Sequence, residues 1–186
     1  VIRSTIIMRN GRRLPAEIPL QPPLYDGITE AELAMSIARY AGAALSRWGH
    51  TVFYTRDGDI DSDLLRPRVT LANRRRADLF VSIHINAAVN QAASGAEVYH
   101  YPGSIDGYRL ATHVDLAFTT RGIPTRGIKS ANFYVLEKTA MPAILVECGF
   151  LSNGDDRRRL SSAEGRRVMG EMIAFGVNSF SRMSYH

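Results

Sequence analysis

Two kinds of hydrophobic pattern alternate along this chain. Residues 79–85 and 143–146 are short, almost continuously apolar runs, a pattern typical of strands buried on both faces of a sheet. Residues 29–48 carry apolar side chains at helical spacing, and Thr29 with Glu32 matches the capping-box pattern at their start. The sequence also predicts helices at residues 68–75, 108–119 and 163–180, strands at residues 5–8, 50–55, 96–101 and 132–136, and a loop at residues 121–130.

Strands that alternate with helices indicate an α/β fold. We expect three layers, with a mostly parallel twisted sheet of five to six strands and helices on both faces. The 186 residues have the length of one domain. Residues 1–27 contain four prolines and are expected to be an atypical N-terminal segment or an insertion, whereas residues 28–186 form the domain itself.

Composition narrows the class of partner. The formal charge is +5, and arginine supplies nearly all the cations, which favours an anionic partner such as nucleic acid, a cell-wall polymer or a membrane surface. The single cysteine, Cys148, excludes an internal disulfide and a cysteine-rich zinc framework. No apolar run approaches the roughly 20 residues that span a bilayer, so stable membrane insertion is not expected. A chain that starts at Val1 without a signal segment fits a processed product or one domain of a longer protein.

Ionisable residues stand where the predicted strands end. One buried strand ends in His84 and another in Glu147, while Glu30 and Glu32 begin the first helix. Strand carboxyl ends and the helix starts that follow them lie on one edge of a parallel sheet, so these groups are expected to converge. A histidine and a carboxylate as metal ligands, with a further carboxylate as base, is an arrangement typical of a zinc hydrolase.

Four ordered motifs give a more specific signal. They are residues 72–87, with ADLFVSIHINA at their end; residues 95–99, GAEVY; residues 126–129, RGIK; and residues 133–153, with MPAILVECGFLSN at their end. In this order they resemble the zinc-dependent N-acetylmuramoyl-L-alanine amidases of the amidase 3 type, over about residues 28–180. The resemblance implies a single α/β domain that cleaves the amide between N-acetylmuramic acid and L-alanine of peptidoglycan with a zinc-activated water.

The resemblance also assigns roles. It implies that His84 and Glu30 are zinc ligands, with Glu32 as the fallback for Glu30, and that Glu147 is the catalytic glutamate. Asn86, Arg126 and Lys129 are weaker candidates for substrate binding. Arg126 and Lys129 bracket a glycine in a predicted loop, a common way to present cations to a carboxylate.

One zinc ligand of the family has no match. The family places a histidine directly after its first strand, but this chain has no histidine before His50. Three explanations are open. The histidine lies upstream of Val1, with residues 1–27 as a long insertion; or the site is degenerate; or another residue such as Asp26 replaces it.

Two rival functions follow from these observations. A non-catalytic peptidoglycan-binding or regulatory pseudo-amidase would account for the missing histidine. A nucleic-acid-binding domain would account for the arginines, but the sequence lacks a recognition motif and interleaved aromatic residues. We expect no nucleic-acid partner. The amidase interpretation places the protein in the cell wall, in the periplasm or outside the cell, or makes it a phage lysin, with further wall-binding domains on a longer chain.

Overall fold

The computed structural model describes residues 5–9, 29–55 and 65–184. Its strands are β1 (Thr5–Arg9), β2 (Val52–Tyr54), β3 (Leu79–Asn86), β4 (Ala96–His100), β5 (Thr125–Ser130) and β6 (Ala143–Phe150). Its helices are α1 (Glu30–Arg47), α2 (Leu65–Arg74), α3 (Ile105–Arg121), α4 (Tyr134–Lys138), α5 (Gly154–Ser161) and α6 (Ala163–Ser184).

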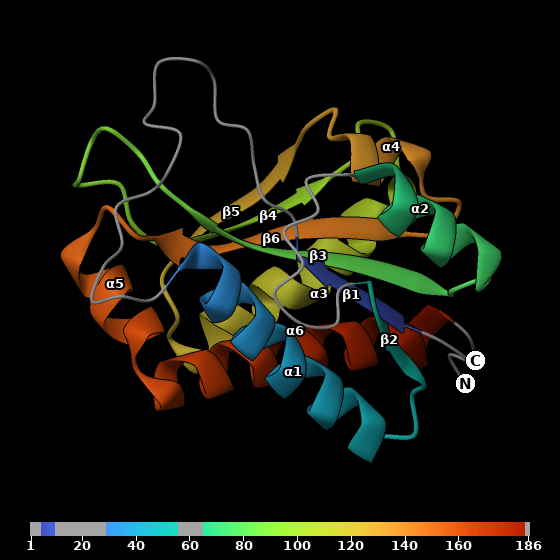
Figure 1. Cartoon of the computed structure of the whole chain (residues 1–186), viewed down its shortest axis with the longest axis horizontal. Coiled ribbons are helices and arrows are strands. Elements are labelled where there is room, and N and C mark those ends of the chain that lie inside the picture. The colour runs from blue at the N-terminus through green and yellow to red at the C-terminus, as the bar shows by residue number, and fades with distance from the viewer. Residues whose placement is uncertain (1–4, 10–28, 56–64, 185–186) are drawn as a thin grey trace.

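The strands form one mixed sheet in the order β2-β1-β3-β6-β4-β5. The first four strands in this order run parallel to one another, β4 runs antiparallel to β6, and β5 runs parallel to β4. Helices α1, α3 and α6 cover one face and α2 and α4 the other (Figure 1). The predicted three-layer α/β fold with a mostly parallel sheet is therefore confirmed.

The central strands are apolar on both faces because each face meets helices. In β3, Leu79, Val81 and Ile83 pack into the large core beneath α1, α3 and α6. Phe80 points the other way, into a smaller core shared with α2 and α4. The same alternation in β6 places Ala143 and Leu145 on the α2/α4 side. This alternation decides which face of the sheet receives each polar side chain further along these strands.

Two predicted elements differ from the structure. The segment predicted as a loop at residues 121–130 contains the edge strand β5, in which only Ile128 packs on the large core. An edge strand with one buried apolar side chain shows no hydrophobic alternation. The strand predicted at residues 132–136 is instead the short helix α4, which buries Val135 and Leu136 against α2. Five residues are too few to distinguish the two periods.

The helix α5 had no counterpart among the predicted elements. Asn153 caps it, because its side-chain oxygen accepts hydrogen bonds from the backbone N–H groups of Asp155 and Asp156. The helix follows β6 directly and lies beyond the carboxyl end of that strand (Figure 1). It therefore flanks the edge where Glu147 was expected to act.

Candidate active site

Three ionisable side chains form a row across the sheet. In the strand register His84 of β3 pairs with Glu147 of β6, and Glu147 pairs with Glu97 of β4. Their positions in the alternation place all three on the face that also carries α2 and α4. Each is 2% exposed. The predicted convergence of His84 and Glu147 is therefore present, and Glu97 joins them.

The start of α1 brings Glu30 to this row. The carboxylate Oε1 of Glu30 lies 3.7 Å from Nδ1 of His84. Glu32, the fallback ligand, is used elsewhere: its Oε2 accepts hydrogen bonds from the backbone N–H and the hydroxyl of Thr29, at 2.7 and 2.9 Å. This capping box fixes the first turn of α1. Glu30, rather than Glu32, is thus the carboxylate that faces the histidine.

The imidazole of His84 is held from its other side. Its Nε2 lies 3.0 Å from the hydroxyl oxygen of Ser82, two residues earlier on the same strand face. When Nε2 donates its proton to Ser82, Nδ1 presents its lone pair toward Glu30. A metal-binding histidine is commonly oriented in this way, through a hydrogen bond made by the ring nitrogen that does not bind the metal.

The pair of His84 and Glu30 fits a zinc ion in chemistry and spacing. At 3.7 Å the two atoms are too far apart for a hydrogen bond. Two ligands at about 2.0–2.1 Å from one tetrahedral ion lie about 3.3 Å apart, which is within a few tenths of an ångström of this distance. A catalytic zinc has three protein ligands. Among the described residues no group of three His, Cys, Asp or Glu side chains could hold a metal, and Asp26 lies outside them.

Glu97 is the centre of a hydrogen-bond cluster. Its carboxylate accepts hydrogen bonds from the hydroxyl of Tyr99 at 2.7 Å, from Nε of Arg126 at 2.7 Å and from Nζ of Lys129 at 2.5 Å. The side-chain nitrogen of Asn86 lies 3.5 Å away. Burial alone would raise the pKa of Glu97, but the donors outweigh it and lower the pKa below its ordinary value. Glu97 therefore stays ionised.

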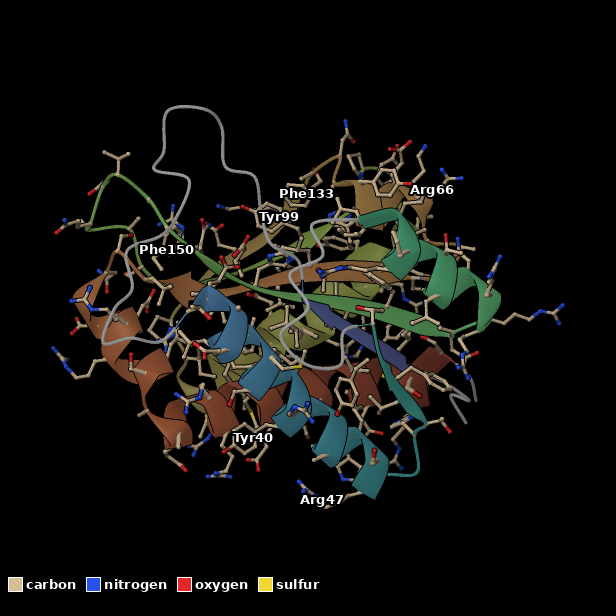
Figure 2. The ribbon with its side chains drawn as sticks, viewed as in Figure 1. Tyr40, Arg47, Arg66, Tyr99, Phe133 and Phe150 are labelled. Carbon is tan, nitrogen blue, oxygen red and sulfur yellow. The ribbon has the colours of Figure 1, made fainter. Side chains whose placement is uncertain are left out.

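The three weaker candidates thus share one partner. Asn86, Arg126 and Lys129 all lie around Glu97, although sequence reasoning treated Glu97 only as part of a motif. A signal was present in the sequence, because Glu97 and Tyr99 are polar positions on one face of a strand whose other face is apolar. Figure 2 shows Tyr99, Phe133 and Phe150 on the sheet face opposite to Tyr40 of α1.

Asp156 of α5 joins the two strands that carry the glutamates. Its Oδ2 accepts hydrogen bonds from the backbone N–H groups of Gly95 and Phe150, both at 2.8 Å. Its Oδ1 accepts one from Nη2 of Arg159 at 2.8 Å. Gly95 immediately precedes β4 and Phe150 ends β6. The buried carboxylate therefore fixes the relative position of the strand ends that place Glu97 and Glu147.

Cys148 contributes packing rather than chemistry. It follows Glu147 on β6, points into the large core and is fully buried. Burial raises the pKa of its thiol, and the nearby charge of Glu147 raises it further. A thiol held neutral in this way is unreactive, so Cys148 acts as a small hydrophobic residue.

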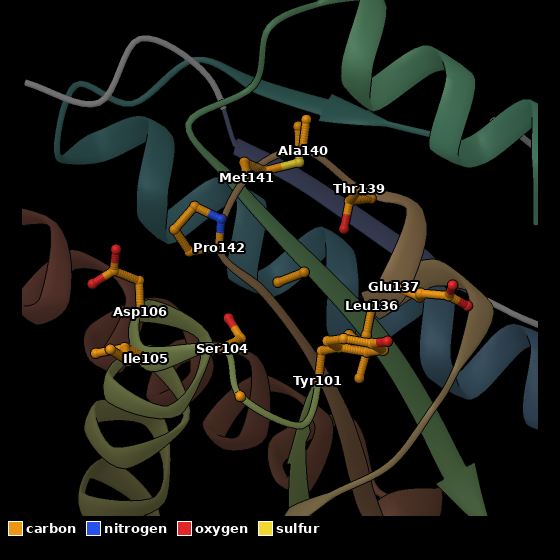
Figure 3. Close-up of a pocket in the computed structure, with 12 residues that line it drawn as sticks. Tyr101, Ser104, Ile105, Asp106, Leu136, Glu137, Thr139, Ala140, Met141 and Pro142 are labelled. Atoms are coloured by element: carbon orange, nitrogen blue, oxygen red, sulfur yellow. The ribbon is translucent and has the colours of Figure 1, made fainter.

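A cavity of about 430 Å³ lies away from these residues (Figure 3). It is lined by the start of α3, by the segment around α4 and by the first residue of β6, Ala143. Ala143 precedes Glu147 by four residues, which is roughly 13 Å along a strand. None of the site residues predicted from the sequence lines this cavity. The cavity is therefore separate from the row of His84, Glu147 and Glu97.

Fold and site together define an α/β protein that gathers one imidazole and several carboxylates at the carboxyl edge of its central parallel strands. Comparison with known proteins gives the particular family. Residues 21–179 match the model of the family described as N-acetylmuramoyl-L-alanine amidase. The chain therefore belongs to the N-acetylmuramoyl-L-alanine amidase family.

Individual relatives agree with this assignment. The chain is 32% identical over 160 residues to the uncharacterized protein YqiI of Bacillus subtilis, covering 83% of this chain and 76% of that protein. It is also 32% identical to the N-acetylmuramoyl-L-alanine amidase LytC of the same species, over 84% of this chain but only 32% of LytC. The structure of the amidase AmiC2 of Nostoc punctiforme superposes with a TM-score of 0.82 at 33% identity, over 96% of this chain and 97% of AmiC2. The chain thus spans about a third of LytC.

Proposed function

We propose that this chain is a peptidoglycan hydrolase that cleaves the amide between the lactyl group of N-acetylmuramic acid and L-alanine. The observation that carries the proposal is the convergence of His84, Glu30 and Glu147, which come from three separate elements of a chain that belongs to the amidase family. The cell wall is then the place of action, as two relatives, from Bacillus anthracis and Staphylococcus aureus, are named cell wall amidases.

Glu30 and His84 are proposed to hold a zinc ion. When bound, zinc would polarise the scissile carbonyl and lower the pKa of a water molecule. Ser82 would keep the imidazole of His84 in one tautomer, so that its Nδ1 remains available to the ion. The capping box of α1 would hold Glu30 in place opposite that nitrogen.

Glu147 is proposed to move the proton. It pairs with His84 in the register and lies on the same sheet face, so its carboxylate is next to the proposed metal ligands. As a base it would accept a proton from the attacking water, and as an acid it would then pass that proton to the leaving amine of L-alanine. Its buried position on a rigid central strand limits its movement between these two steps.

The decisive experiment combines zinc content with hydrolysis. The purified chain is analysed for zinc by elemental analysis and then incubated with peptidoglycan, and new N-terminal L-alanine is measured. We expect about one zinc per chain and release of L-alanine termini. Glu30→Gln and His84→Ala are expected to lose both zinc and activity, whereas Glu147→Gln should retain zinc and lose activity.

Glu32→Gln is the matched control for Glu30→Gln. The two glutamates stand in the same first turn, and glutamine also functions in a capping box, so this variant should keep the helix start, zinc and activity. A parent chain that takes up no zinc from excess metal and releases no L-alanine would refute the proposed activity. It would favour the non-catalytic peptidoglycan-binding module.

We also propose that this activity belongs to one domain of a longer protein. Because the chain matches only part of LytC, we propose that it acts as a catalytic unit next to wall-binding segments of a longer protein. In the part of the chain that the structure describes, no helix has the length and apolar character needed to cross a bilayer.

A further inference from the structure

The cluster around Glu97 holds more positive than negative charge. Arg126 and Lys129 both donate to the same carboxylate oxygen, Oε1 of Glu97, at 2.7 and 2.5 Å. One cation would neutralise one buried carboxylate. The second cation is then left for a further negative group, and both of these hydrogen bonds go to Glu97 rather than to Glu147, which is directly opposed to it. One of the two cations is therefore available to an anionic ligand beside Glu147.

Both cations retain donors that face solvent. The side chain of Arg126 is 44% exposed and that of Lys129 is 37% exposed, whereas Glu97 is 3% exposed. Arg126 uses Nε for Glu97, so its two terminal nitrogens remain, and Lys129 uses one of its three N–H groups. The buried carboxylate thus fixes two exposed cations side by side, so little entropy is lost when they bind a ligand.

The cluster also lies at a suitable distance from the proposed reaction. Glu97 and Glu147 are directly opposed in the antiparallel pair of β4 and β6, and the Cβ atoms of such residues lie about 4.5–5.5 Å apart. An extended peptide advances about 3.3 Å per residue. A group on the residue after L-alanine can therefore reach the cations while the amide is next to Glu147.

We propose that Arg126 and Lys129, positioned by Glu97, bind a free carboxylate on the second residue of the stem peptide. This inference rests on the proposed function and adds its substrate preference: stems with a free α-carboxylate at that residue are favoured over stems in which it is amidated. An uncharged amide cannot form the charge-assisted hydrogen bonds that a carboxylate forms with a guanidinium and an ammonium group. Glu97 is a positioning residue in this scheme, because it acts through the two cations.

The test compares two ligands that differ in one group. In both ligands the γ-carboxyl of the second residue is blocked as a methylamide, so that N-acetylmuramoyl-L-alanyl-D-isoglutamate carries one free carboxylate and its D-isoglutamine counterpart carries an amide in its place. Binding of each is measured by titration calorimetry to the full chain loaded with zinc, in the Glu147→Gln background so that turnover is blocked. We expect the carboxylate ligand to bind at least about 10-fold more tightly, the effect of one hydrogen bond to a charged group.

Variants separate this subsite from general damage. Lys129→Met is expected to reduce the affinity ratio of the two ligands several-fold. Lys138→Met is the matched control, because Lys138 is the other lysine of the chain and pairs with Glu137 beside the separate cavity. Glu97→Gln should also reduce the ratio. A purely structural role of Glu97 would instead lower both affinities equally and leave the ratio unchanged.

The outcomes distinguish the two proposals. Equal affinity for both ligands, or binding of neither, overturns the carboxylate subsite whether or not the parent chain hydrolyses peptidoglycan. A carboxylate preference in a chain that releases no L-alanine supports the subsite and refutes the amidase activity. An affinity ratio that Lys138→Met lowers as much as Lys129→Met does also overturns the subsite, because the preference then reflects overall charge.

Discussion

Asp156 provides the sharpest prediction about stability. Its carboxylate is 2% exposed and accepts hydrogen bonds from two backbone N–H groups, those of Gly95 and Phe150, and from Arg159. Asp156→Ala removes all three acceptor contacts. Each buried donor left without a partner costs about 1–3 kcal/mol, and breaking a buried ion pair costs about 3–5 kcal/mol. Because Arg159 can turn toward solvent, we expect a loss of about 3–5 kcal/mol of unfolding free energy.

Asp155→Ala is the matched control, one residue earlier on α5. Asp155 also pairs with an arginine, but its side chain is 87% exposed and that of Arg158 is 79% exposed. An exposed pair contributes about 0.2–1 kcal/mol, so this variant should lose about 1 kcal/mol or less. Urea denaturation followed by circular dichroism measures both values. A loss below about 1 kcal/mol for Asp156→Ala, or equal losses for the two variants, would refute the view that this carboxylate joins β4 to β6.

Two further predictions concern helix packing and acid stability. A Cβ atom on Gly170 of α6 would lie 2.6 Å from the backbone oxygen of Ile37 in α1. Gly170→Ala should therefore lower the unfolding free energy, measured by urea denaturation, by about 1–3 kcal/mol. Gly154→Ala is the control, because a Cβ atom there would meet open space, and it should not destabilise the fold. Equal effects would contradict the close approach of α1 and α6. The pKa of Glu97 is lowered in the folded chain, so its ionisation stabilises the fold above the ordinary carboxyl pKa of 4.5, and this contribution is lost as the pH falls through the folded value. The stability difference between the parent and Glu97→Gln should therefore shrink as the pH is lowered from 7 to about 3, and a constant difference in urea midpoints would contradict it.

The sequence predicted the structure best in the elements where burial imposes a clear pattern of apolar side chains. The apolar runs of β3 and β6 predicted two doubly buried strands, because every residue in such a strand meets a helix layer. The capping box at Thr29 predicted the start of α1 within one residue. From these two features alone, Glu30, His84 and Glu147 are predicted at one edge of the sheet. What the sequence predicted well is therefore the part of the site carried by core elements.

The rest of the site depends on pairings that no local pattern encodes. Lys129 and Arg126 were expected in a loop, but they belong to an edge strand that pairs with β4, and this pairing brings them to Glu97. The antiparallel register that places Glu97 beside Glu147 is set by strand order rather than by spacing along the chain. Likewise, no pattern in the sequence indicates that Arg159 of α5 pairs with the buried Asp156. The long-range partners of these polar residues therefore determine whether they belong to the site or only to the surface.

The position of β1 bears on the missing zinc ligand. Residues 5–9 form a strand between β2 and β3, so part of the segment expected to be an insertion belongs to the sheet. Because β1 is parallel to β3, the chain after Arg9 leaves the sheet at the same edge where β3 presents His84. The sequence from there to Ile28 has no histidine, and its only carboxylates are Glu17 and Asp26. If zinc binds with three protein ligands, Asp26 and Glu17 are candidates for the third ligand by their chemistry, beside a histidine upstream of Val1. A site with one histidine and two carboxylates would then suit zinc less tightly than one with two histidines, so zinc stoichiometry is best measured across a range of metal concentrations.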